Sequence, residues 1–189
     1  KVISFVDAHC SGIFVDVRCG GSANALYARS KGLRAIGVEF GEKQYKLAAT
    51  NTNECILAGG SCDVLRTSDD VAVAFERQID LKDVEYFFGA FAVKAKYVLF
   101  TAPYVTEIDD KAVAFRDSWN ETGSAPEYCV FDFGLLMDYM IQRGYRLIED
   151  SMENIRLGFF TRNAVGRLQR AYGRDDLTFK RYTAVYALN

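Results

Sequence analysis

The chain has 189 residues and a mass of 21.2 kDa, which fits one domain spanning residues 1–189. Hydrophobic residues make up 50% of it, charged residues 25%, and only 2 residues are prolines, which excludes a disordered or low-complexity chain. The net charge of −2 and the pI near 5.5 argue against nucleic acid as a partner, because proteins dedicated to nucleic acid are usually basic.

Targeting and cysteine patterns favour a cytoplasmic protein with no membrane span. No apolar run reaches the roughly 18 residues that a spanning helix needs, and residues 1–10 lack the charged and then apolar build of a signal peptide. The 5 cysteines are scattered without a C-x-x-C pair, so the sequence predicts neither a disulfide framework nor a metal site.

Short apolar segments alternate with segments of helical periodicity along most of the chain. We expect strands at 13–17, 33–40, 54–58, 71–75, 97–100, 145–148 and 182–188. We expect helices at 22–31 and 42–52, a third that Asp80 caps, a fourth that Asp132 caps and Gly144 ends, and a short one at 163–173. Such alternation predicts a parallel sheet covered by helices on both faces.

Three segments give more specific predictions. In the helix after Asp80, apolar residues fall at i, i+3, i+4 and i+7, which predicts that they pack in the core: Val84, Phe87, Phe88 and Phe91. The last strand breaks the alternation, so we expect it to insert antiparallel at or near the sheet edge. Residues 103–130 are predicted to be irregular and polar.

The loop after the first predicted strand combines an acidic residue with small residues. Asp16 lies near the strand end, and Gly20 and Gly21 precede a helix that starts near Ser22. In an open α/β sheet, ligands bind at the carboxyl ends of the strands, where small residues and free helical N–H groups allow close approach. Asp16 would repel a pyrophosphate but attract a cofactor that carries a sulfonium and an ammonium. Alternatively, Asp16 caps the loop by binding backbone N–H groups.

The run I-F-V-D-V-R-C-G-G-S at residues 13–22 resembles the first motif of Rossmann-like (class I) S-adenosylmethionine-dependent methyltransferases, whose usual run is V-D-x-G-C-G-x-G. In that family the acidic residue and the glycine loop hold the methionine part of the cofactor. The resemblance implies S-adenosyl-L-methionine as cofactor and S-adenosylhomocysteine as product. It places these residues at the cofactor: Asp16, Arg18, Cys19, Gly20 and Gly21.

Later segments resemble the rest of that site. Glu39 follows Gly20 by 19 residues and is similar to the acidic residue that binds both ribose hydroxyls, which a carboxylate accepts well. The run Ser61–Asp63 resembles the place where an acidic side chain meets the adenine amino group. By the same resemblance the cofactor site extends to Phe40, Cys62, Asp63 and Glu76.

The resemblance covers residues 12–188 in order. It implies an α/β fold, a three-layer Rossmann-like sandwich with a mostly parallel seven-stranded sheet and an antiparallel last strand. Arg18 and Ser22 stand where the family has the first and third loop glycines. A long cation beside a sulfonium is unfavourable unless it points to solvent or pairs with a carboxylate. Arg18 therefore keeps open an alternative: a methyltransferase-like module without catalysis that acts as a binding partner.

The acceptor side is less well marked. In methyl transfer the cofactor supplies the reactivity and the protein positions the acceptor, so we assign no catalytic residue. The lone His9 would be a general base only if the N-terminus folds over the site, and a surface position is the alternative. Residues 103–130 are predicted to form a substrate lid or insertion, with Tyr104, Glu107 and Trp119 contacting the acceptor. We expect that acceptor to be a small molecule or a saccharide.

Two features keep a nucleic-acid methyltransferase open as a further alternative. The run T-A-P-Y at residues 101–104 faintly resembles the N/D-P-P-Y motif of enzymes that methylate amino groups of DNA bases. Residues 151–178 are predicted to be an inserted segment whose helix carries Arg167, Arg170 and Arg174 on one side. Such a face is either solvated or in contact with an anionic acceptor.

Overall fold

The computed structural model describes residues 2–20, 22–51, 55–57, 65, 70–76, 81–108, 111–118, 127–154, 166, 169–170, 173 and 180–189. In this part of the chain the strands are β1 (Ile13–Val17), β2 (Arg34–Glu39), β3 (Cys55–Leu57), β4 (Val71–Glu76), β5 (Tyr97–Ile108), β6 (Lys111–Ser118), β7 (Glu127–Asp132), β8 (Tyr145–Asn154) and β9 (Lys180–Leu188). The helices are α1 (Val2–His9), α2 (Ala23–Ser30), α3 (Glu42–Asn51), α5 (Leu81–Phe91) and α6 (Phe133–Gln142).

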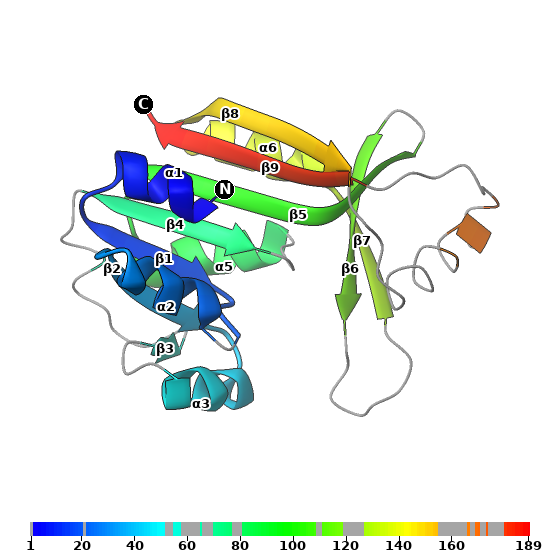
Figure 1. Ribbon diagram of the computed structural model, residues 1–189. Coiled ribbons are helices and arrows are strands. Elements are labelled where there is room, and N and C mark those ends of the chain that lie inside the picture. The colour runs from blue at the N-terminus through cyan, green and yellow to red at the C-terminus, as the bar shows by residue number, and fades with distance from the viewer. Residues whose placement is uncertain are drawn as a thin grey trace.

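The strands form one sheet with a parallel core in the order β3-β2-β1-β4-β5 (Figure 1). β9 pairs antiparallel with β5, and β8 pairs antiparallel with β9, so β8 runs parallel to β5. The expected antiparallel last strand is therefore confirmed, and it lies between β5 and β8. The strand order reverses between β1 and β4, and in open α/β sheets ligands bind in the crevice expected at the carboxyl ends of two such strands.

The sheet has nine strands in the described residues, so the expected number of seven is not confirmed. The two additional strands, β6 and β7, form an antiparallel hairpin that pairs with the outer half of β5. Figure 1 shows this hairpin standing away from the parallel core. The prediction that residues 103–130 are irregular is wrong for their described part, because apolar runs at 112–115 and 128–131 build these strands.

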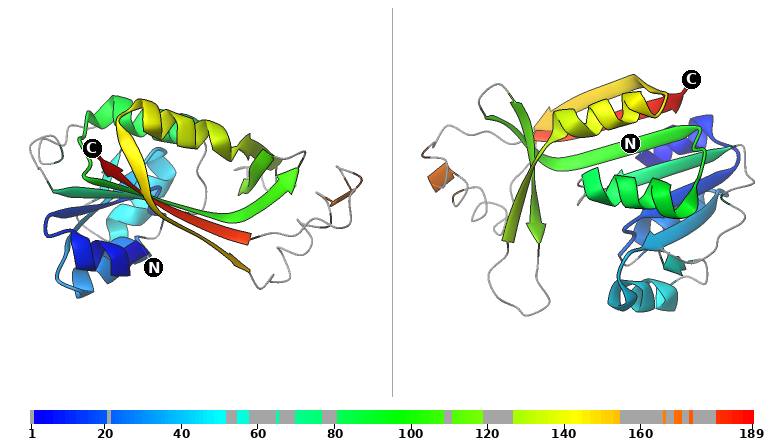
Figure 2. Two further views of the ribbon diagram at one scale, coloured as in Figure 1. Left: turned by 90° about the horizontal axis from the view of Figure 1, so that it is seen from above. Right: turned by 180° about the vertical axis from the view of Figure 1, so that it is seen from behind.

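Helices cover both faces of the sheet, which confirms the three-layer architecture. α1 and α2 lie on one face and α5 and α6 on the other (Figure 2), while α3 lies against β2 and β3. Under α5 the predicted stripe is buried, since the following residues are at most 2% exposed: Val84, Phe87, Phe88 and Phe91. None of the described helices combines the length and apolar character needed to span a membrane.

The sequence analysis did not predict α1. Its buried residues Val2 and Val6, with Cys10 just beyond its end, recur every four residues and pack against Ala25 and Ala28 of α2. That spacing is a helical signal. α1 thereby covers the face of the sheet on which part of the candidate site lies.

Candidate functional site

Two buried carboxylates lie where neighbouring parallel strands end. Asp16, on β1, is in register with Gly37 of β2 and Ala74 of β4 and is 2% exposed. Glu39 is the last residue of β2 and is 4% exposed. Because β1 and β2 run parallel and adjacent, both carboxylates belong to the same edge of the sheet, beside the crevice. Asp16 was predicted here from the strand end and the motif, and Glu39 from the strand end and its 19-residue offset from Gly20.

The loop that follows β1 is held in a left-handed conformation at several positions. The φ angles are 58° at Arg18, 53° at Gly20 and 60° at Ser22. The backbone N–H groups of Arg18 and Cys19 both donate to the carbonyl of Val38, at 2.8 and 3.4 Å, which ties the loop to β2. A left-handed φ suits glycine and is unfavourable for arginine. Residue 18 thus has a backbone conformation typical of glycine although it is an arginine.

Glu39 is bound to this loop. The backbone N–H of Gly20 donates a hydrogen bond to its carboxylate. Burial raises the pKa of Glu39 above its usual value, and this outweighs the Gly20 N–H and the positive charge of Arg18, which both lower it. A Cβ placed on Gly20 would meet no atom within 4 Å, so the loop leaves space beside this residue.

Arg18 crosses from the loop to α5. Its guanidinium forms an ion pair of 2.6 Å with Asp83, in the first turn of α5, and the two side chains are 28% and 10% exposed. The guanidinium also lies 5.3 Å from the centre of the Phe40 ring, and Tyr86 of α5 packs edge-on against that ring at 5.2 Å. The condition set by the sequence analysis, a carboxylate partner for this cation, is therefore met.

Asp83 is the residue of this site that sequence reasoning missed. An acidic residue in a first helical turn ordinarily complements the helix dipole, so its position alone indicates no other role. The partner Arg18 is 65 residues away in the chain, and only the packing of α5 beside β1 brings the two together.

The other predicted site residues fall at several places. Glu76 ends β4 at the same edge, and Tyr104 and Glu107 lie in the outer half of β5. Four predicted residues lie outside the described residues: Gly21, Cys62, Asp63 and Trp119.

His9 belongs to the opposite edge of the sheet. It ends α1 and precedes β1, whose chain runs away from it toward the loop at Arg18. The exposed His9 ring stacks on Phe5 at 4.3 Å, and its Nδ1 is hydrogen-bonded to the carbonyl of Phe5 at 2.9 Å. The surface interpretation of His9 is therefore confirmed, and the structure provides no support for it as a general base.

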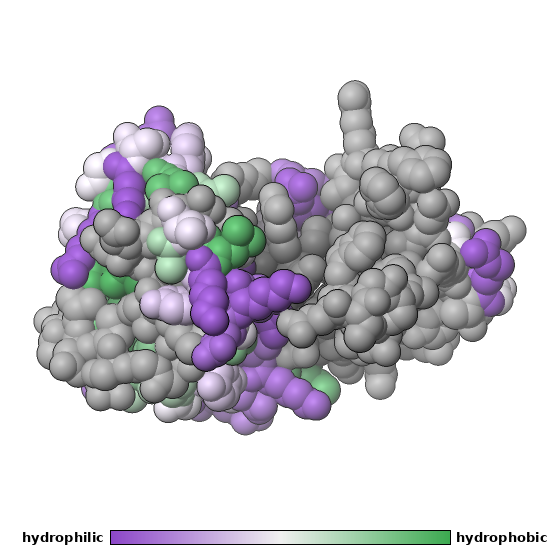
Figure 3. Space-filling model, turned by 90° about the horizontal axis from the view of Figure 1, so that it is seen from below, coloured by the Kyte–Doolittle hydropathy of each residue, from purple (hydrophilic) through white to green (hydrophobic). Residues whose placement is uncertain are grey.

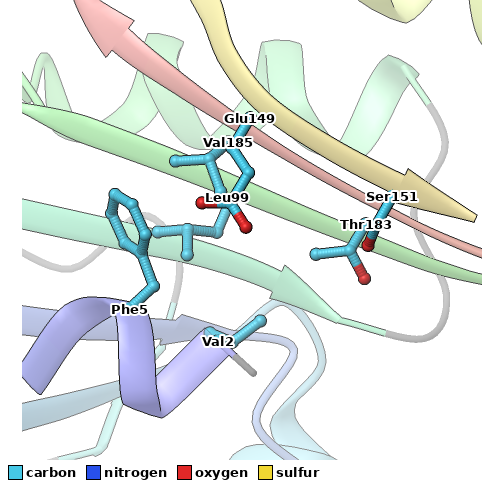
Figure 4. A pocket seen from close by; sticks show the side chains of 7 residues that line it. All are labelled: Val2, Phe5, Leu99, Glu149, Ser151, Thr183 and Val185. Carbon is cyan, nitrogen blue, oxygen red and sulfur yellow. The ribbon is translucent and has the colours of Figure 1, made fainter.

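A small pocket lies on the α1 face of the sheet (Figure 4). Its cavity volume is about 20 Å³, and the space around it, open solvent included, is about 270 Å³. The apolar part is made by Val2, Phe5, Leu99 and Val185, and the polar part by Glu149, Ser151 and Thr183. Sequence reasoning missed it because α1, β5, β8 and β9 contribute to it from distant parts of the chain.

A row of polar residues connects the crevice edge with this pocket. Glu76 of β4 is in register with Thr101 of β5, Thr101 with Thr183 of β9, and Thr183 with Ser151 of β8. Seen from below, hydrophilic residues lie both in the middle and at the left of the described surface (Figure 3). The register row places two polar residues, Glu76 and Thr101, side by side on β4 and β5.

The sequence matches no protein-family model and no curated protein. Solved structures do share its fold. A S-adenosylmethionine-dependent methyltransferase from Methanosarcina mazei superposes with a TM-score of 0.61 at 9% identity, over 97% of this chain and 96% of that one. The glycopeptide N-methyltransferase MtfA with S-adenosylhomocysteine bound has a TM-score of 0.58 at 8% identity, over 100% and 88% of the two chains. A proposed RNA methyltransferase from Pyrococcus horikoshii has a TM-score of 0.56 at 8% identity, over 99% and 82%.

The chain therefore has the fold of class I S-adenosylmethionine-dependent methyltransferases, as the resemblance of its first motif implied. At identities of 8–9% the comparisons show the fold alone, so the reaction has to be inferred from the residues of the site. Since one similar structure is a proposed RNA methyltransferase, the comparisons do not support the argument from net charge against nucleic acid as a partner.

Proposed function

We propose that this protein binds S-adenosyl-L-methionine at the carboxyl ends of β1, β2 and β4 and transfers its methyl group to a small-molecule or saccharide acceptor. The observation that carries the proposal is the pair of buried carboxylates, Asp16 and Glu39, that flank a left-handed glycine loop where the strand order reverses. Two carboxylates at a crevice favour a positively charged ligand over a pyrophosphate.

The residues present fit this cofactor. Glu39 has two oxygens that can accept hydrogen bonds from two ribose hydroxyls, and the loop at Gly20 leaves space for close approach of a ligand. Asp16 places negative charge at the crevice, where it would attract the ammonium of the methionine part. When bound, the cofactor supplies an electrophilic methyl group on a sulfonium. The remaining proposed contacts are Arg18, Cys19, Gly21, Phe40, Cys62, Asp63 and Glu76.

We place the acceptor toward β5 and the pocket of Figure 4. Neighbouring strands are about 5 Å apart, so Thr183 lies about 10 Å from the register position of Glu76. The pocket combines apolar walls with two hydroxyls and the carboxylate of Glu149, so we assign it to one small part of the acceptor, a group that offers hydroxyl or amino donors. The insertion at 103–130, with Tyr104, Glu107 and Trp119, is proposed to bound the same acceptor space.

The task of the protein in such a reaction is positional. The strand ends fix the acidic groups, the loop after β1 holds the donor side, and the pocket orients the acceptor so that its nucleophilic atom faces the methyl group. α1 and the sheet face supply the apolar walls of the pocket, which include the buried Leu99 and Val185. No side chain is assigned to remove the proton of the acceptor.

Calorimetric titration with S-adenosylhomocysteine tests the donor half of the proposal. We expect saturable binding to the wild type, loss of binding in Asp16→Asn, and unchanged binding in Asp138→Asn, a matched control on the exposed side of α6. No heat and no thermal shift at millimolar ligand, with the protein folded, would contradict it. Transfer of a labelled methyl group from S-adenosylmethionine to panels of amines, phenols and saccharides then tests the acceptor class.

Arg18, in place of the first loop glycine of the family, motivates a second candidate, a module of this fold that binds a partner and has lost catalysis. The two candidates differ in the transfer assay. A chain that binds neither S-adenosylmethionine nor S-adenosylhomocysteine, in the wild type and in Arg18→Gly alike, supports the module. Nucleic acid as the acceptor is a third case, and it predicts RNA or DNA binding that falls steeply with salt concentration.

A further inference from the structure

We propose that Arg18, Asp83 and Phe40 form a latch that closes the cofactor site, and that the cofactor displaces the Arg18 guanidinium when it binds. This inference rests on the proposed function, because it concerns access to the same carboxylates. It assigns Arg18 the role of setting cofactor affinity, a role that neither the fold nor the motif predicts.

The latch joins two elements at the carboxyl ends of the parallel strands. Arg18 belongs to the loop after β1, and Asp83 belongs to α5, the first helix described after β4. In an open α/β sheet, ligands bind where the strand order reverses, which here is between β1 and β4. The ion pair of 2.6 Å therefore links the elements that follow these two strands.

The guanidinium lies near the residues expected to hold the ribose. It is 5.3 Å from the centre of the Phe40 ring, next to Glu39 in the chain, and its charge acts on the Glu39 carboxyl. Glu39 is 4% exposed and the Arg18 side chain is 28% exposed. A ribose bound to the Glu39 oxygens would compete with Arg18 for the space beside Phe40, and displacement of the guanidinium would free that space.

The conformation of Arg18 makes such movement feasible. A φ of 58° is strained for a residue with a Cβ, so the closed state is held by the ion pair and the ring contact against backbone strain. Glycine at this position would adopt the same backbone without strain and without a side chain over the crevice. The latch therefore lowers cofactor affinity relative to a loop with glycine at residue 18.

Two variants distinguish a latch held by the Arg18–Asp83 ion pair from a side chain at residue 18 that merely occupies ligand space. Arg18→Gly removes the side chain, and Asp83→Asn keeps Arg18 but removes the charge that holds it. We expect S-adenosylhomocysteine to bind about 10-fold more tightly to Arg18→Gly and several-fold more tightly to Asp83→Asn, by calorimetry. The control is Arg143→Gln, whose guanidinium makes a similar ring contact with Phe88 at 4.7 Å outside this site and whose loss leaves affinity unchanged.

A ligand-independent measurement uses the thiol of Cys19, which lies beside Arg18 and is buried. We expect iodoacetamide to alkylate Cys19 about 10-fold faster in Arg18→Gly and faster in Asp83→Asn than in wild type, as followed by peptide mass spectrometry. Thermal melting shows whether each variant is folded. If one variant is unfolded, the binding and alkylation results of the other variant test the latch.

The outcomes distinguish this inference from the proposed function. Equal or weaker binding by both variants, or unchanged Cys19 alkylation in both, overturns the latch even if the wild type binds S-adenosylhomocysteine. Binding by the variants with none by the wild type supports it. If no form binds the ligand, the proposed function fails, and the alkylation rates still decide whether Arg18 and Asp83 close the crevice.

Discussion

Two acidic residues at opposite edges of the sheet are buried to different extents. At the amino edge, Asp70 precedes β4 and accepts hydrogen bonds of 2.7 Å from both the amide and the hydroxyl of Ser11, and it pairs with Lys96 at 3.6 Å. At the carboxyl edge, Glu39 accepts hydrogen bonds from the Gly20 and Phe40 amides and the Cys19 thiol, and the Arg18 charge acts on it. Both acids therefore have donors and a nearby cation, and they differ in burial, since Glu39 is 4% exposed and the Asp70 side chain 25%.

The pKa values follow this difference. Burial alone would raise the pKa of Asp70, but the Ser11 donors, the Cys10 thiol and the Lys96 charge together lower it. Burial raises the pKa of Glu39 despite the Gly20 amide, the charge of Arg18, the Phe40 amide and the Cys19 thiol, which all lower it. A lowered pKa means that the ionised group stabilises the fold, and a raised pKa means that ionisation costs stability. Ionised Asp70 at the amino edge thus stabilises the fold, whereas ionisation of Glu39 at the carboxyl edge lowers the free energy of unfolding.

The largest effect that tests this contrast is expected from Glu39→Gln. Because its pKa is raised, Glu39 costs stability once the pH exceeds its pKa, so the variant should melt about 2 °C higher at pH 7. It should also bind S-adenosylhomocysteine about 100-fold more weakly, since it loses two hydrogen bonds to a charged acceptor. Calorimetric binding and thermal melting measure both. A variant that melts lower and binds normally would show that Glu39 is a structural residue.

The next largest effect is expected from Asp70→Ala, at the other edge. Removing the acceptor of two Ser11 hydrogen bonds should lower the free energy of unfolding by about 2 kcal/mol, with unchanged S-adenosylhomocysteine affinity. Urea unfolding measures this at pH 7 and in acid. Because the pKa of Asp70 is lowered, its contribution is present above the unfolded-state pKa and is lost as the pH falls through the folded-state pKa. The two proteins should therefore converge in stability in acid, and a constant difference would exclude ionisation as the cause.

A smaller effect is expected from Tyr145→Phe, also at the amino edge. The Tyr145 hydroxyl donates a buried hydrogen bond of 2.9 Å to the carbonyl of Ala95, so its removal should cost about 1 kcal/mol. Burial raises the pKa of Tyr145 to about 12, so the hydroxyl stays protonated at any pH well below that value. The loss of stability in the variant should therefore not change with pH around neutrality. Urea unfolding at several pH values checks this, and a cost that varies around neutrality would contradict it.

The smallest effect is expected from Lys96→Gln. The Lys96 and Asp70 side chains are 47% and 25% exposed, so solvent screens their ion pair and its loss should cost about 0.5 kcal/mol or less. The cost should shrink further at high salt. A loss as large as that of Asp70→Ala would mean that Lys96, rather than Ser11, holds the acid in place.

The parallel core could be predicted because its strands are buried on both faces. Buried strands need short apolar runs, and all five residues of β1 are buried. The outer ends of β5 and β8 were not predicted. β8 continues to Asn154 through Glu149, Asp150 and Glu153, because an edge strand tolerates polar side chains and so loses the apolar signal. The hairpin of β6 and β7 escaped notice for a related reason, since polar residues surround its short apolar runs.

The candidate site was predictable to the extent that strand ends define it. Asp16 and Glu39 were found because each ends or nearly ends a strand and their spacing matches a known motif. Asp83 was not found, because an ion pair between residues 65 apart depends on how a helix packs beside a loop. The pocket of Figure 4 is of the same kind, since it exists only where α1 meets β8 and β9.

The position of β9 has a consequence for how the chain is made. β5 and β8 are synthesised before β9, and β9 lies between them. Until residues 180–188 leave the ribosome, the inner half of β5 and the whole of β8 lack the neighbour that satisfies their backbone groups. The part of the sheet made by β5, β9 and β8 can therefore form only after β9 has been translated. A chain arrested earlier would expose the unpaired edges of β5 and β8 to other nascent chains.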